Sequence, residues 1–231
     1  MRSATYVMQC IRQAYLRVSP SSHRSRGVMK HVAKRHSLNY IRRLHKMTKS
    51  HRVIGGLTAS TTHHDFNYMY GTIDSYTVRV VERRDVVAGE LRAVSMRWVI
   101  AEIDLRHNPD VPHIFIAPNG SDRIPYSRLF RTAPALTPIN LGSSQHYPDD
   151  FEAHYTLYAR PSVAQLCETL FTPYVAKHVV ARLFPHAIEL HHGRLYVYAS
   201  HSLITRPIID ALVGQAVWLA KTLDNNSLTQ R

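Results

Sequence analysis

Histidine and carboxylate side chains occur together in two short segments, a combination that can bind a metal ion because imidazole and carboxylate groups are common zinc ligands. The two groups are His63-His64 with Asp65, and His186 with Glu189, His191 and His192. Adjacent residues of a strand point to opposite faces, so His191 and His192 can share one ion only if a turn reorients them. Neither group has an HExxH or CxxC motif. We therefore interpret them as surface loop histidines and assign no metal.

The other reactive side chains form no catalytic signature. Cys167 lies among apolar residues of a predicted helix, where a thiol usually acts as a small buried hydrophobe. Asp149, Asp150 and Glu152 lie in a proline-flanked connection, which favours carboxylates that begin an element or contact water over a pair that shares a proton. The chain contains no GxSxG motif and no glycine-rich phosphate loop. We predict a protein that is not an enzyme and uses no cofactor, and we identify no small-molecule substrate. The alternative is an unrecognised hydrolase or metalloenzyme around the His-rich hairpin.

The strongest functional signal is the distribution of charge along the chain. The 231 residues include 29 Lys or Arg against 16 Asp or Glu, which gives a formal net charge of +13. No acidic residue precedes Asp65, and residues 1–64 carry 13 of the basic side chains. Because the remaining residues are electrically balanced, the whole excess belongs to the first quarter of the chain.

Two helical patterns carry this charge, over residues 4–18 and 28–47. In both, apolar residues recur at helical spacing and basic side chains fill the other sides. Since basic amphipathic helices bind anionic surfaces, we predict peripheral attachment to an anionic membrane surface or to an acidic protein. The predicted partner-binding residues are Arg12, Arg17, Lys30, Lys34, Arg35, Arg42, Arg43 and Lys46.

The same basic region leaves other interpretations open. It could bind the phosphates of a nucleic acid, although the chain lacks zinc-finger spacing, an RNP-type aromatic motif and a GXXG loop in a helical setting. An acid-free segment rich in Arg and Ser is also typical of a mitochondrial targeting segment. The alternative without a function is a solvated tail that has no dedicated partner.

After residue 65 the composition of the sequence changes. β-branched and aromatic residues separated by turn residues become frequent, which predicts strands. Gly55-Gly56 and the Ser/Thr run to Thr62 predict a hinge before them. We expect a basic helical extension over residues 1–56 and an α+β domain over residues 57–231, in which an antiparallel sheet is combined with segregated helices. Expected strands cover residues 76–81, 91–105, 111–116 and 151–159 and a hairpin at 187–190 and 195–198, and expected helices cover 163–171, 174–184 and 207–223.

Four tyrosines near the C-terminal hairpin could form a recognition surface, because tyrosine combines apolar area with a polar tip. They are Tyr155, Tyr158, Tyr196 and Tyr198. Half of them must point inward if the strands pack on helices, so we favour core and cross-strand packing over a binding patch.

Three segments of the last third carry a family resemblance. They are the strand pattern of residues 151–159, the helix start Phe171-Thr-Pro-Tyr174, and the hairpin segments 188–190 and 194–198. Over roughly residues 66–222 the chain resembles uncharacterised bacterial proteins grouped as domain of unknown function 3137. Many members of that group carry hydrophobic, membrane-spanning segments before this domain, whereas this chain has a basic one. The resemblance implies no particular activity.

The sequence also bears on the compartment. Cys10 and Cys167, the two cysteines, fall in differently composed regions and indicate a reducing environment. No apolar stretch approaches the roughly 18 residues that a membrane-spanning helix needs, and the N-terminus lacks the pattern of a secretory signal. We expect a cytoplasmic protein with peripheral membrane attachment, or a mitochondrial one if the N-terminus is a targeting segment.

Overall fold

A single antiparallel sheet organises the part of the chain that the computed structural model describes, residues 20–42, 53–57, 63–87, 94–120, 135–142, 146–200 and 204–228. Its strand order is β1-β2-β3-β4-β9-β8-β5-β7-β6. The strands are β1 (Asn39–Ile41), β2 (His63–Ile73), β3 (Tyr76–Val87), β4 (Val94–Asp104), β5 (Ile114–Pro118), β6 (Thr137–Ile139), β7 (Tyr155–Ala159), β8 (Ala187–His191) and β9 (Arg194–Ser200). The helices are α2 (Pro20–Arg35), α4 (Asp149–His154), α5 (Ala164–Leu170), α6 (Pro173–Leu183) and α7 (Arg206–Leu228).

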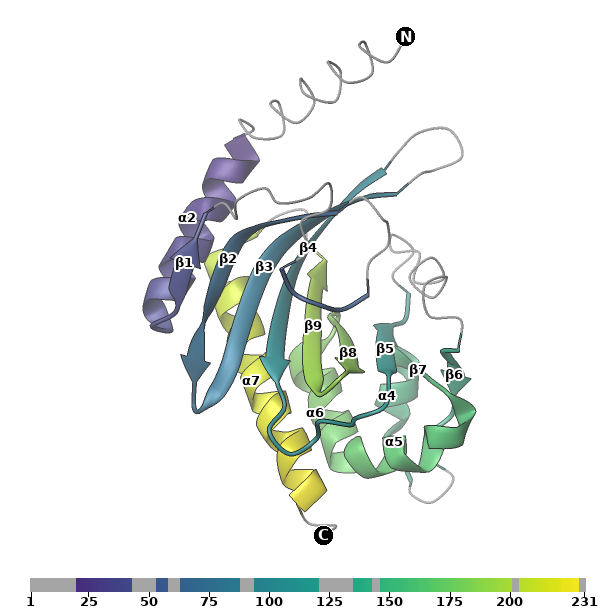
Figure 1. The fold of residues 1–231 in the computed structure, drawn as a ribbon. Helices are drawn as coiled ribbons and strands as arrows, with labels where there is room; N and C mark the ends of the chain where they lie inside the picture. Colours follow the sequence, from purple (N-terminus) through teal and green to yellow (C-terminus); the bar gives the residue numbers. More distant parts are fainter. Residues whose placement is uncertain are drawn as a thin grey trace.

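The helices lie on one face of the sheet, and α2 lies beside β1 at the edge (Figure 1). Alternate strand residues point to this helix-covered face, as Val78 and Val80 do on β3, and they pack in the main core with apolar residues of α7 such as Leu212 and Val213. The sheet with segregated helices confirms the α+β fold. The predicted helices at 163–171, 174–184 and 207–223 and the predicted hairpin correspond to α5, α6, α7 and β8–β9.

The opposite side of the sheet, which we call the front face because it is turned toward the viewer in Figure 1, has a smaller core of its own. Trp98 and Ile100 of β4, Phe115 of β5 and Tyr196 and Tyr198 of β9 belong to it, and each is at most 4% exposed. The preference for core packing is therefore confirmed for Tyr196 and Tyr198. Both hydroxyls lie under a covering segment that is described below.

The second predicted helix is wrong in its extent. It was expected over residues 28–47, but α2 ends at Arg35, where Leu38 N donates to Ala33 O at 2.8 Å and Ser37 has a positive φ of 56°. The chain then enters β1, which pairs with β2. Residues 151–159, expected as one strand, begin in α4 and become β7 only at Tyr155.

The described parts of the expected extension, residues 1–56, pack into the cores of the body, α2 into the main core and Ile54 into the front-face core. Val28, Met29 and Val32 of α2 are buried against the helix-covered face, and Leu38 joins them. The predicted helix over residues 4–18 lies outside the described residues. In the described ranges, no helix is long and apolar enough to cross a membrane.

Candidate functional site

The outward side of α2 presents basic side chains. The helix contains no acidic residue, and its inward positions such as Met29 and Val32 are at most 1% exposed. Lys30, Lys34 and Arg35, three of the predicted partner-binding residues, are exposed on the outward side, and Arg42 is exposed just after β1. Arg24 is exposed on the same side of the helix, and Arg26 is half-buried at its border. Of the eight predicted residues, Arg12, Arg17, Arg43 and Lys46 lie outside the described residues.

One of these cations also contacts the body of the protein. Arg35 forms an ion pair with Asp210 of α7 at 2.7 Å, but its side chain keeps 66% of its surface exposed. The neighbouring His36 contacts the other oxygen of Asp210 at 2.8 Å. An ion pair this exposed contributes little to stability. It joins the end of α2 to α7 and leaves the basic side of α2 exposed to solvent.

A buried polar network holds the inner side of α2 in place. Glu82 of β3 is fully buried and accepts a hydrogen bond from Ser25 Oγ at 2.6 Å and another from Asn67 Nδ2 at 2.8 Å. Arg97 of β4 forms an ion pair with the same carboxylate. A buried carboxylate needs such partners because desolvation penalises its charge. The network therefore specifies how α2 docks on the sheet.

Residues 53–57, which we call the crossing segment, lie across the front face between β2 and β8 (Figure 1). Three sheet carboxylates accept hydrogen bonds from its backbone. Val53 N donates to Asp65 Oδ2, Gly55 N to Glu102 Oε2 and Leu57 N to Glu189 Oε2, each at 2.9 Å. The predicted hinge is thus wrong at Gly55-Gly56, because these residues are held on the sheet. The rest of that hinge, residues 58–62, lies outside the described residues.

Arg83 of β3 completes the attachment of the crossing segment. Its side chain is fully buried and donates to both oxygens of Asp65, at 2.6 and 2.8 Å, and to Ile54 O at 2.9 Å. Burial by itself lowers the pKa of Arg83, but the hydrogen bonds and charge of Asp65 outweigh it, so the pKa lies above its ordinary value. The Arg83 guanidinium therefore stays charged across the physiological pH range.

The two glycines are required by the tyrosines beneath them. A Cβ on Gly55 would lie closer than 3.0 Å to Tyr196 Oη, and one on Gly56 equally close to Tyr198 Oη. Gly56 also has φ +86°, a conformation that residues with a side chain rarely adopt. Burial first, and then the charges of nearby carboxylates, raise the pKa of both tyrosines, so their hydroxyls remain protonated. The Tyr198 hydroxyl donates to Glu189 Oε2.

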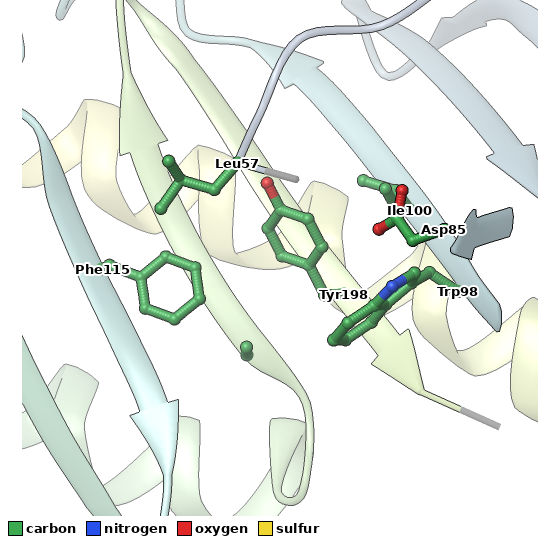
Figure 2. A pocket seen from close by; sticks show the side chains of 7 residues that line it. Leu57, Asp85, Trp98, Ile100, Phe115 and Tyr198 are labelled. Carbon is green, nitrogen blue, oxygen red and sulfur yellow. The ribbon is translucent and has the colours of Figure 1, made fainter. Parts of the chain in front are cut away.

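A shallow recess adjoins the crossing segment on the front face (Figure 2). Aromatic rings form much of its wall. The rings of Trp98 and Tyr198 pack edge to face, with their centroids 6.1 Å apart. It leaves no volume for a water-sized sphere, so this recess is a packing feature and not a cavity for a small molecule. Its lining residues are Leu57, Asp85, Trp98, Ile100, Phe115, Ala187 and Tyr198.

Neither of the two histidine groups predicted from the sequence forms a cluster with the predicted members. Asp65 is buried against Arg83 while His64 is exposed. In the second group, Glu189 meets a histidine that sequence reasoning missed, because His113 Nε2 lies 2.7 Å from Glu189 Oε1. The rings of His113 and His191 stack with centroids 4.0 Å apart. Nothing in the local sequence indicates this contact, which depends on the pairing of β5 with β8.

Cys167 is fully buried in the main core, as expected for a small hydrophobe. Burial, and to a smaller degree the charge of Glu168, raise the pKa of its thiol to about 12. The thiolate that would act as a nucleophile is therefore scarcely populated at neutral pH.

Comparisons with known proteins bear on the fold. No family model and no curated protein matches the chain. Among solved structures, the crystal structure of the mycobacterial trehalose monomycolate transport factor A matches with a TM-score of 0.52 and 9% sequence identity, covering 87% of this chain and 93% of that chain. At this identity the likeness concerns the fold alone. The chain therefore shares its α+β architecture with that transport factor over most of both lengths.

Proposed function

We propose that this protein is a non-enzymatic interaction module that binds an anionic membrane surface peripherally through the outward side of α2. The observation that carries the proposal is the set of Lys and Arg side chains on that side of a helix that has no acidic residue. They are Arg24, Arg26, Lys30, Lys34 and Arg35, together with Arg42 directly after the end of β1. We call this set the cationic face of α2.

The docked position of α2 makes the cationic face an ordered surface. Its inner side is fixed by the apolar core and by the Glu82 network, so binding does not have to order a disordered chain. Near an anionic membrane each Lys or Arg contributes about 1 kcal/mol. A few such contacts made together suffice for reversible attachment at moderate salt, and added salt weakens them.

One further consideration supports a non-enzymatic role. The solved structure with the same fold is named as a transport factor, and this name describes no chemical reaction. The resemblance to domain of unknown function 3137, which we also carry as a proposal, implies no particular activity. Arg12, Arg17, Arg43 and Lys46 stay predicted contributors to the same surface.

Reversing two charges on α2 tests the proposal. In vesicle flotation, the full chain is expected to bind phosphatidylserine-containing vesicles and not pure phosphatidylcholine vesicles. Lys30→Glu combined with Lys34→Glu should weaken this binding at least about tenfold, because two attractive contacts become repulsive. The matched control is Arg160→Glu with Lys177→Glu, which makes the same change in net charge at exposed residues away from α2.

The outcomes separate the alternatives. If the two double variants lose vesicle binding equally, only net charge matters for binding, and the proposal fails. Binding without dependence on anionic lipid would also contradict it. If vesicles do not bind but the α2 variant abolishes binding to mixed DNA and RNA with a steep salt dependence, the nucleic-acid alternative replaces it.

A further inference from the structure

Three potential metal ligands meet on the front face where β5 begins and β8 ends. The strands pair antiparallel with Phe115 opposite Glu189 and Ile114 opposite Leu190, so His113 and His191 are next to each other one position further out. Glu189 and His191 are two residues apart on β8 and therefore share a face. One ligand atom from each of His113, Glu189 and His191 lies within 4.8 Å of the other two.

Glu189 is held in the manner of a metal-binding carboxylate. It is 1% exposed, and its Oε2 accepts hydrogen bonds from Leu57 N at 2.9 Å and from the Tyr198 hydroxyl. Its Oε1 is turned toward His113 Nε2. Hydrogen bonds that orient a ligating carboxylate from behind are typical of metal sites. A cation at Oε1 would also compensate the buried negative charge.

Only small movements are needed to enclose an ion. Zinc binds nitrogen and oxygen ligands at about 2.1 Å, so two ligands of a tetrahedral site lie about 3.4 Å apart. The His113 and Glu189 atoms, 2.7 Å apart, must therefore separate by about 0.7 Å to admit the ion. One histidine ring must also turn out of the stack. Both histidines are half-buried, so neither is fully enclosed by protein.

We propose that His113, Glu189 and His191 bind one divalent first-row transition-metal ion of the Zn²⁺ class. Two imidazole nitrogens and one carboxylate oxygen form a ligand set that suits zinc, and water would complete four-coordination. The ion would link β5 to β8 at the end of the sheet. This site is separate from the cationic face of α2 and does not depend on the proposed function.

The test uses the metal-free full chain with Co²⁺ and Zn²⁺ as probes. Co²⁺ is expected to give the intense visible absorption of a tetrahedral site at one equivalent, and Zn²⁺ should displace it. His113→Ala and His191→Ala should each weaken binding at least about tenfold. The matched controls, His31→Ala and His146→Ala, remove exposed histidines elsewhere and should leave the affinity unchanged.

A second variant separates ligation from folding. Glu189→Gln keeps an oxygen that can accept from Leu57 N and the Tyr198 hydroxyl but removes the anionic ligand, so metal binding should fall while circular dichroism stays native. Equal affinities in the cluster variants and the controls would assign the binding to dispersed surface histidines and overturn the proposal. Absence of a tetrahedral Co²⁺ spectrum in the folded chain would overturn it as well.

Discussion

Replacing Arg83 with methionine is expected to lower the free energy of unfolding by about 3–5 kcal/mol. Methionine fills similar space, but Asp65 then keeps a buried charge without its cationic partner, and Ile54 O loses a donor. Leaving one member of a buried ion pair uncompensated is among the most costly single changes in a protein. Urea denaturation of the variant and the parent protein measures the difference.

Arg35→Met is the control at an exposed ion pair. Arg35 pairs with Asp210 at 2.7 Å, but its side chain is 66% exposed. Solvent screens that pair, so its loss should cost about 1 kcal/mol. Adding Asp65→Leu to Arg83→Met should recover part of the lost stability, since no buried charge remains. Equal costs at the two arginines would show that the Arg83 pair is not the anchor described above.

Gly56→Ala is expected to destabilise the protein by about 2–4 kcal/mol, from its positive φ and from the clash with Tyr198 together. Gly120→Ala isolates the first contribution, because Gly120 has φ +72° and a Cβ there would meet nothing within 4 Å. That control should cost only about 1 kcal/mol. Thermal unfolding of both variants provides the comparison.

Removing the tyrosine hydroxyl should reverse part of the Gly56 effect. Tyr198→Phe removes the atom that lies nearest to a Cβ at position 56. Gly56→Ala should therefore destabilise the Tyr198→Phe variant less than it destabilises the parent protein. If Gly56→Ala and Gly120→Ala destabilise equally, the crossing segment does not pack on the tyrosines.

Local patterns predicted the last third of the chain well because its elements are specified by neighbouring residues. The hairpin β8–β9 turns at Gly193, which has φ +67°, and Pro207 lies in the first turn of α7. Each of these elements shows its own periodicity or turn residue. No long-range contact is needed to recognise them.

The crossing segment and the histidine cluster depend on contacts that sequence periodicity cannot reveal. Gly55 and Gly56 have the composition of a hinge, but the carboxylates and tyrosines that hold them come from four different strands. His113 is 76 positions from Glu189, and only the order of strands brings them together. The end of α2 at Arg35 could not be predicted for the same reason, since the chain that follows it forms β1 by pairing with the distant strand β2.

The positive charge of the candidate site was predictable from composition, whereas the way in which the fold exposes that charge was not. The sequence places the excess of basic residues before residue 65, and Lys30, Lys34, Arg35 and Arg42 are exposed as the interpretation requires. The amphipathic pattern of α2 was interpreted as a surface-binding helix. Its apolar side instead packs in the protein's own core, which leaves the basic side as the available surface.

Energy transfer to a vesicle surface tests most directly which part of the molecule approaches the lipid. In a Cys10→Ser background, where Cys167 is buried and unreactive, a donor dye is attached at Gly27→Cys or at Leu166→Cys. Position 27 is open on the outward side of α2, and residue 166 is exposed on α5 at the far end of the sheet (Figure 1). With acceptor-labelled phosphatidylserine vesicles, transfer should be clearly stronger from position 27 than from position 166. Equal transfer, or stronger transfer from position 166, would contradict the assignment of α2 as the binding face.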